Sequence, residues 1–182
     1  MTVQTKIVIY SMALSLLLSV GLTLGAEMGE RAEKVATEDA DFVKGAASGG
    51  MMEVQLGKTA QENASKTQVK EFGRRMQTDH SKANNDLKKI AAKKDIKLPT
   101  ELERQHKSTL DKLSKLKGGE FDREYMSTMV TDHKEDIEKF QEEAEKGKDP
   151  DVKKFAKDNL PILKKHLALA EETQKQISGK GK

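Results

Sequence analysis

Residues 72–80 (FGRRMQTDH) and residues 125–133 (YMSTMVTDH) share one spacing of an aromatic residue, a methionine and an Asp-His pair. In each stretch the aromatic residue, the methionine and the histidine follow one another at intervals of four. An α-helix therefore places all three on one face. The copies begin 53 residues apart. The echo predicts two helices that occupy equivalent places in two helical hairpins.

Apolar residues at helical spacing continue outward from both stretches. They predict four long helices, at about 39–63, 65–94, 120–146 and 150–177, and a short helix at about 100–116. Asp149 and Pro150 form an N-cap followed by proline at the first helical position. Thr100 with Glu103 is a capping box that should open the short helix, and Gly118-Gly119 should end it. Pro161 is expected to kink the last helix.

The lengths of the connections predict how the helices pair. The first two long helices are joined tightly, and so are the last two, whereas a long segment with the short helix links the two pairs. Two hairpins joined by a crossover form the ferritin-like arrangement. We therefore expect an all-α, ferritin-like antiparallel four-helix bundle with a short extra helix on the crossover.

The composition limits the classes of function. The 182 residues suit one domain, and they are 35% hydrophobic, 35% charged and 4% aromatic. The net charge of +3 comes from 33 basic and 30 acidic residues, and this balance indicates no nucleic-acid partner. The chain has no cysteine, which excludes disulfides, thiolate zinc sites, iron–sulfur clusters and cysteine nucleophiles.

The N-terminus has the pattern of a targeting segment. Lys6 precedes a mainly apolar run at 7–24, and small residues follow at Gly25 and Ala26. Residues 1–26 are predicted to be a secretory signal peptide, or an uncleaved anchor that would keep the domain near a membrane. The expected location is the periplasm or cell envelope. Residues 27–37 are interpreted as a flexible lead-in, 38–177 as the bundle and 178–182 as a disordered tail.

Each long helix has one metal-capable residue in the middle of its inward stripe. Counted from the hairpin turns, these four residues fall within a few ångströms of one height, because a helix rises about 1.5 Å per residue. The predicted metal ligands are Glu53, His80, His133 and His166. Asp79 and Asp132 each precede a histidine and could orient an imidazole or bind from the flank. Met76 and Met129 lie near the same layer as possible outer partners.

Three imidazoles and one carboxylate suit a single zinc, copper, iron or manganese ion. Thioethers beside imidazoles would suit copper in an oxidising compartment. Di-iron bundles place Glu-x-x-His motifs on facing helices, and no Glu-x-x-His motif places ligands on facing helices here. Single buried histidines and core methionines are more often structural, so a His–Glu network without metal is the main alternative.

Four segments resemble the domain-of-unknown-function 4142 family: residues 42–60 (FVKGAASGGMMEVQLGKTA), 72–84 (FGRRMQTDHSKAN), 121–136 (FDREYMSTMVTDHKED) and 160–172 (LPILKKHLALAEE). The likeness covers about residues 40–172. It implies a ferritin-like bundle of exported bacterial proteins and no established activity. The residues that match the family pattern are Glu53, Asp79, His80, His106, Asp132, His133 and His166.

The sequence is therefore compatible with three functions. The first is an exported bundle that binds one transition-metal ion, for metal handling or protection against stress. The second is a structural or interaction bundle with a buried His–Glu network. The third, for which the sequence offers least, is a metal-dependent oxidase. The sequence contains no phosphate loop, nucleophile elbow or haem-attachment motif.

Overall fold

The computed structural model describes residues 35–179, and they form five helices without a strand. The helices are α1 (Thr37–Asn63), α2 (Thr67–Lys93), α3 (Arg104–Ser114), α4 (Gly118–Lys146) and α5 (Pro150–Ile177). The predicted targeting segment, most of the lead-in and the last three residues lie outside this range. Within it, no helix is long and apolar enough to cross a membrane.

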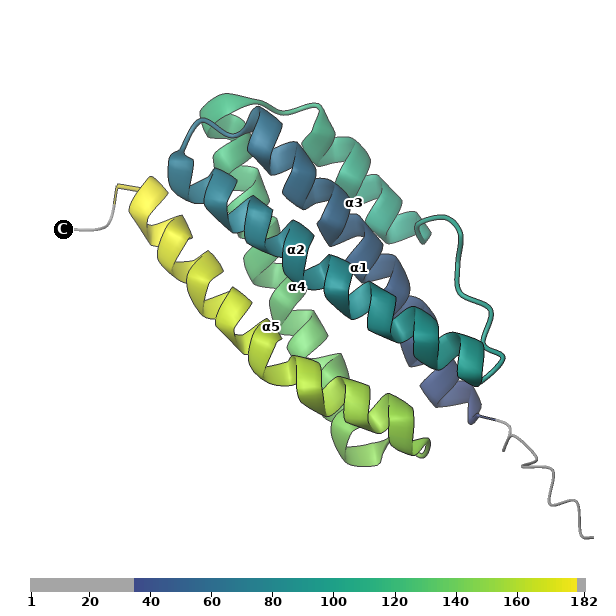
Figure 1. The fold of residues 1–182 in the computed structure, drawn as a ribbon. Coiled ribbons are helices and arrows are strands. Elements are labelled where there is room, and N and C mark those ends of the chain that lie inside the picture. The colour runs from purple at the N-terminus through teal and green to yellow at the C-terminus, as the bar shows by residue number, and fades with distance from the viewer. Residues whose placement is uncertain (1–34, 180–182) are drawn as a thin grey trace, which may run out of the picture. The chain divides into compact units, whose positions relative to one another are not determined.

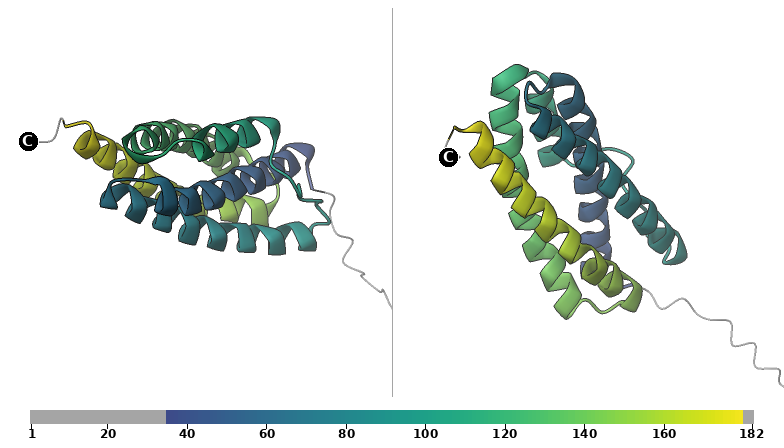
Figure 2. Two further views of the ribbon diagram at one scale, coloured as in Figure 1. Left: turned by 90° about the horizontal axis from the view of Figure 1, so that it is seen from above. Right: turned by 60° about the vertical axis from the view of Figure 1, so that its left-hand side comes forward.

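The long helices form two hairpins that pack on each other, α1 with α2 and α4 with α5 (Figure 1). Between the hairpins, α1 packs on α4 and α2 on α5, so α2 and α4 occupy opposite corners of the bundle. The short helix α3 lies along α1 and also touches α4 (Figure 2). The predicted four-helix bundle with a short helix on its crossover is confirmed.

Local signals account for several helix ends. The side chain of Asp149 accepts hydrogen bonds from the backbone N–H groups of Asp151 and Val152, and Pro150 begins α5 as expected. After α2, Asp95 adopts a left-handed backbone conformation with φ 54°, which aspartate tolerates better than most residues. The helix therefore stops before Pro99, as the sequence predicts.

The short helix begins later than its sequence signals suggest. It starts at Arg104, and Glu103 is the N-cap residue without a side-chain capping bond, so the predicted capping box at Thr100 is wrong. The backbone N–H of Glu103 instead donates to the hydroxyl of Ser48 on α1, at 2.8 Å. A contact with another helix therefore replaces the local cap.

The Gly118-Gly119 pair was expected to end the short helix, and that prediction is also wrong. The helix α3 already ends at Ser114, and Gly118, with φ 61°, begins α4. The side-chain amide of Asn63 donates to the Leu116 carbonyl at 2.9 Å, which holds the chain in its turn between the two helices. Glycine is suited to this start because it adopts positive φ without steric cost.

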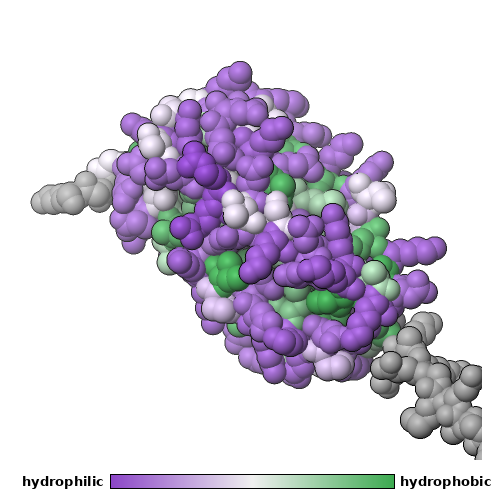
Figure 3. All heavy atoms as spheres, in the orientation of Figure 1, coloured by the Kyte–Doolittle hydropathy of each residue, from purple (hydrophilic) through white to green (hydrophobic). Residues whose placement is uncertain are grey.

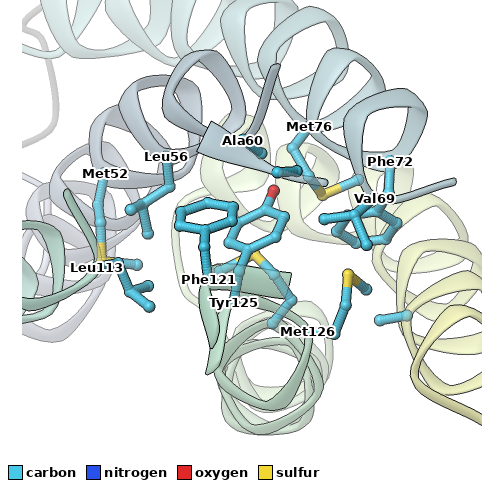
Figure 4. Packing of buried hydrophobic residues seen from close by; sticks show 13 residues of the cluster. Met52, Leu56, Ala60, Val69, Phe72, Met76, Leu113, Phe121, Tyr125 and Met126 are labelled. Atoms are coloured by element: carbon cyan, nitrogen blue, oxygen red, sulfur yellow. The ribbon is translucent and has the colours of Figure 1, made fainter. Parts of the chain in front are cut away.

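Two apolar clusters fill the bundle, one toward each end. The first apolar cluster lies near the α1–α2 turn and is built around Tyr125, whose ring stacks on Phe121 and meets Phe72 edge-on (Figure 4). The second apolar cluster lies near the α4–α5 turn and includes Phe140 and Phe155. The face shown in Figure 3 is largely hydrophilic, with small separate apolar patches. Buried polar side chains, among them Glu53, His80, His133 and His166, lie between the two clusters.

Aspartates from opposite hairpins hold the two tight turns. Asp122, at the start of α4, accepts from the backbone N–H groups of Ser65 and Lys66 in the α1–α2 turn. Asp39, at the start of α1, accepts from the backbone N–H groups of Lys148 and Asp149 in the α4–α5 turn. Each hairpin thus supplies hydrogen-bond acceptors for the backbone N–H groups of the other hairpin's turn. These contacts fix the relative position of the two hairpins along the bundle axis, and with it that of the residues midway along them.

Candidate metal centre

One polar side chain from each long helix lies in the layer between the two apolar clusters. Glu53 on α1, His80 on α2, His133 on α4 and His166 on α5 are all buried, with exposed fractions of 1%, 7%, 0% and 0%. Their placement follows from helical periodicity, because each sits on the same inward stripe as the apolar residues one turn before and after it. Four elements therefore each contribute one residue to a single site.

The three imidazole rings face one another across the bundle. The ring centroids are 5.3 Å apart for His80 and His166, 5.4 Å for His133 and His166, and 5.8 Å for His80 and His133. Each ring offers one ligand atom such that all three atoms lie within 4.8 Å of one another. Ligands of a tetrahedral zinc ion are spaced by about 3.3 Å, so small side-chain rotations would bring all three onto one ion.

Each of the three rings uses one nitrogen for a protein contact. His80 Nδ1 lies 2.7 Å from Glu53 Oε2, and His166 Nε2 is hydrogen-bonded to Asp79 Oδ2 at 2.9 Å. His133 Nδ1 lies 2.9 Å from the carbonyl oxygen of Met129, which can only accept, so this ring carries its proton on Nδ1. Metal-binding histidines are commonly held in this way by a carboxylate or a carbonyl.

The second nitrogen of each ring is buried and has no hydrogen-bond partner within residues 35–179. These atoms are His80 Nε2, His133 Nε2 and His166 Nδ1. A buried polar atom without a partner is rare and costly in folded proteins. Three such atoms on neighbouring rings are therefore the feature of the site that most needs an explanation.

Glu53 belongs to a second group that overlaps the first. Its Oε1 lies 3.4 Å from His133 Nε2, and Glu53, Asp132 and His133 each offer a ligand atom within 4.8 Å of the other two. The four predicted ligands and Asp132 thus form two overlapping groups, one of three histidines and one of two carboxyls with His133. Among the described residues, His133 is the member that both groups share.

Burial keeps the histidines neutral. Desolvation lowers the pKa of His80, His133 and His166 to about 4 each, against an ordinary value of 6.5. The charge of Glu53 opposes this shift at His133, and the hydrogen bond with Asp79 opposes it at His166. Neutral imidazoles are the form that binds metal, so all three rings are competent ligands at neutral pH.

The neighbouring carboxyls are shifted in the opposite direction. Burial raises the pKa of Glu53 from 4.5 to about 8. Burial, together with the charge of Glu53, raises the pKa of Asp132 from 3.8 to about 9. Two neighbouring carboxyls that are expensive to ionise would both be stabilised in their charged form by a cation between them.

The predicted outer residues take different positions. Asp79 contacts His166, whereas Asp132 lies with Glu53. The side chains of Met76 and Met129 are buried in the first apolar cluster, and Met129 contacts His133 through its backbone carbonyl. His106 on α3 belongs to neither group, and its Nδ1 lies 2.7 Å from the Ser48 hydroxyl.

Asp136 is a site residue that was not singled out from the sequence. It follows Asp132 by one helical turn on α4, and burial raises its pKa. It lines a cavity of about 30 Å³ together with Glu53, Asp79, His80 and His166, which is room for one ion or one water molecule. The Asp132-x3-Asp136 spacing was a usable signal, because it extends the acidic face of α4 by one turn.

Comparison with known proteins gives a family and a fold. A solved structure described as the DUF305 fragment from Deinococcus radiodurans matches with a TM-score of 0.70 and 11% identity, covering 79% of this chain and 99% of that one. At this identity the match shows the fold alone. No curated protein matches the chain. A family model described as Domain of unknown function (DUF4142) matches residues 25–173, and the chain belongs to this family.

Proposed function

We propose that this DUF4142 protein binds one divalent transition-metal ion through His80, His133 and His166 and acts in metal handling outside the cytoplasm. The observation that carries the proposal is the set of three buried imidazole nitrogens that have no partner within residues 35–179, on rings whose other nitrogens are already held. A cation would give all three nitrogens a partner at once. Imidazole ligands suit zinc, copper, iron and manganese.

Glu53, which the sequence suggested as a ligand, is assigned two tasks in this proposal. Its Oε2 holds His80 Nδ1, and its Oε1 faces His133 Nε2 at 3.4 Å, the spacing of two ligands on one tetrahedral ion. It also brings negative charge to a buried cation, which would otherwise be expensive to place among neutral groups. Asp79, which is hydrogen-bonded to His166, adds a second negative charge near the proposed ion.

A His–Glu network without metal is the main rival function. The Glu53–His80 contact of 2.7 Å supports it. Such a network, however, occupies only one nitrogen of His80 and gives no partner to His166 Nδ1. The metal proposal accounts for more of the buried polar atoms and is therefore preferred.

A metal-dependent oxidase is a second candidate because the site adjoins a large cavity. This cavity, of about 700 Å³, reaches Asp132, one of the carboxyls beside His133. Such access would allow a small molecule to approach a bound ion. Oxygen consumption by the iron-loaded protein, above the rate of a His80→Ala variant, would support an oxidase, and equal rates would reject it.

Titration calorimetry on metal-free protein tests the binding proposal. We expect one equivalent of Zn²⁺ to bind and to raise the melting temperature, because the ion binds the folded state. His166→Ala should lose most of the affinity. The matched control is His106→Ala, which removes the one histidine outside the cluster and should leave the affinity unchanged. Absence of binding for Zn²⁺, Cu²⁺, Fe²⁺ and Mn²⁺ would reject the metal site.

The proposed location rests on the N-terminal segment. A single positive charge at Lys6, the apolar run at 7–24 and the small residues Gly25 and Ala26 support export. N-terminal sequencing of protein from the cell envelope should give a start near residue 26 or 27. A start at Met1 or Thr2 would indicate a retained anchor, and recovery of the protein only from the cytoplasm would contradict export.

A further inference from the structure

An acidic cavity of about 700 Å³ lies beside α1 and α4, with α3 at its edge. Nine carboxyl side chains and three lysines line it, and Asp132 and Asp136 are among the carboxyls. A concave surface of one dominant charge raises the local concentration of ions of the opposite charge. The acidic cavity is therefore suited to collect cations rather than anions.

The inner wall of the acidic cavity reaches the buried layer at Asp132. The Oδ2 atom of Asp132 is buried and has no hydrogen-bond partner in the described part of the chain. Asp132 shares its group with Glu53, which is 1% exposed; Glu53 Oε2 lies 2.7 Å from His80 Nδ1 and its Oε1 lies 3.4 Å from His133 Nε2. Asp136 lines both the acidic cavity and the small cavity that holds Glu53, His80 and His166. Carboxyl side chains thus continue from the acidic cavity to the histidines.

His133 belongs both to the group with Glu53 and Asp132 and to the group of three histidines, but it can bind one ion at a time. Its Nδ1 faces the Met129 carbonyl, so Nε2 is the one nitrogen left for a ligand. That nitrogen lies 3.4 Å from Glu53 Oε1 and also belongs to the group of three histidines. The two groups therefore cannot both hold an ion through His133 at the same time.

We propose that Glu53, Asp132 and His133 form a transient cation position at the inner wall of the acidic cavity, through which a divalent transition metal passes to the three histidines. The proposal rests on the proposed function and adds its path. An ion arriving from water first exchanges part of its hydration shell for carboxylate oxygens, which suit hydrated divalent ions. It then moves onto nitrogen ligands as His133 keeps hold of it, so no step leaves the ion without protein ligands.

Binding kinetics of Co²⁺ to the metal-free full chain test this path, since bound Co²⁺ reports through its visible absorption. In Asp132→Asn the association rate constant should fall by about tenfold or more. The dissociation rate constant, measured with excess chelator, should fall by a similar factor, because Asp132 acts on the path and not in the final site. The dissociation constant should therefore change by less than about threefold. Asp111→Asn, at an exposed position of α3, is the matched charge control and should keep the parent rates.

A second variant isolates the outer position. In the His80→Ala/His166→Ala double variant, Co²⁺ should still bind weakly, with the low absorption intensity of a site rich in oxygen and water ligands. Adding Asp132→Asn should abolish that binding. Unchanged association rates in Asp132→Asn, or no Co²⁺ binding by the double variant, would overturn the path while leaving the three-histidine site intact. If the parent itself takes up no Co²⁺ at equilibrium, the proposed function and the path fail together.

Discussion

The two copies of the aromatic-Met-Asp-His motif, on α2 and α4, agree in their inward-facing residues and differ in the surroundings of their aspartates. Their aromatic residues, Phe72 and Tyr125, meet at a centroid distance of 6.0 Å, and their histidines, His80 and His133, meet at 5.8 Å. The inward face of the motif is thus used in the same way in both copies. This agreement follows from helical periodicity, which sends every fourth residue toward the bundle axis.

The two aspartates of the motif have different surroundings. Asp79 is about one-third exposed and accepts a hydrogen bond from His166 on the neighbouring helix α5. Asp132 is turned toward Glu53 on the neighbouring helix α1, and its Oδ2 is buried without a donor among residues 35–179. The same dipeptide therefore orients His166 in one copy and adds a costly buried carboxyl in the other. The neighbouring helix, and not the motif, decides the role.

Removing the histidine of each copy should give the largest effect. His80→Ala and His133→Ala should each weaken binding of Zn²⁺ by about a hundredfold or more, because a ligand is lost as well as its orientation. His133→Ala should be the more severe, since His133 belongs to both groups of ligand atoms. Competition with a chromophoric chelator measures both constants. Equal losses of Zn²⁺ affinity in the two variants, or negligible losses in both, would contradict the assignment of His133 to both groups.

Changing the two aspartates should separate the copies at equilibrium. Asp79→Asn should lower Zn²⁺ affinity by roughly tenfold to a hundredfold, because it removes the carboxylate that holds His166. Asp132→Asn should leave the dissociation constant within about threefold of the parent, as argued for the path of the ion. The same competition assay applies, with Asp111→Asn as the control. Equal losses in both variants would mean that Asp132 is a ligand of the final site.

The buried carboxyl of the second copy should also appear in the pH dependence of stability. The pKa of Asp132 is raised from 3.8 to about 9 by burial and by Glu53, so the folded protein keeps a proton that the unfolded chain releases. The contribution of protonated Asp132 to the unfolding free energy is complete below about pH 4 and is lost as the pH rises toward 9. In metal-free parent protein, the unfolding free energy should therefore fall as the pH rises from 5.5 to 8.5. In Asp132→Asn this fall should be smaller by on the order of 2 kcal/mol.

Urea denaturation at several pH values measures this difference, and Asp111→Asn again serves as the exposed control. Parallel pH profiles for the parent and Asp132→Asn would contradict the assignment of a buried, protonated carboxyl. The histidines act in the opposite direction, since their pKa values of about 4 lie below the ordinary value of 6.5. Their contribution is lost between about pH 6.5 and 4, so the acid side of the profile should be steep in both proteins.

The smallest predicted effect concerns the aromatic residues of the two copies. The hydroxyl of Tyr125 is buried in the first apolar cluster without a hydrogen-bond partner in the range that the structure covers. Tyr125→Phe makes the second copy match Phe72 of the first and should raise the unfolding free energy by about 1 kcal/mol. Thermal and urea denaturation provide the measurement. A loss of stability would indicate that the hydroxyl has a partner, such as a buried water molecule.

Much of the architecture was readable from local patterns. The Asp149-Pro150 signal and the apolar stripe of α5 predicted a helix from 150 to 177, and α5 has those bounds. Counting residues from the two turns placed Glu53, His80, His133 and His166 at one height, and all four lie in one buried layer. Such features depend on spacing along a single helix and on the lengths of two turns.

Other features depended on contacts between elements and could not be predicted. The start of α3 was missed because the Ser48 hydroxyl on α1 accepts from the backbone of Glu103, 55 residues away. The reciprocal contacts of Asp39 and Asp122 with the two turns were missed for the same reason. The roles of Asp79 and Asp132 required knowledge of which helix lies beside α2 and which beside α4.

The sequence by itself therefore determined the helices, their inward faces and the set of candidate ligands, because periodicity and capping act within a few residues. Tertiary structure alone decided which nitrogen of each clustered histidine is held and which has no partner among the residues that the structure describes. It also decided that Asp132 and Asp136 reach the acidic cavity. The physical reason is that a side chain at the edge of the inward face points toward a neighbour, and the neighbour is set by how the two hairpins pack.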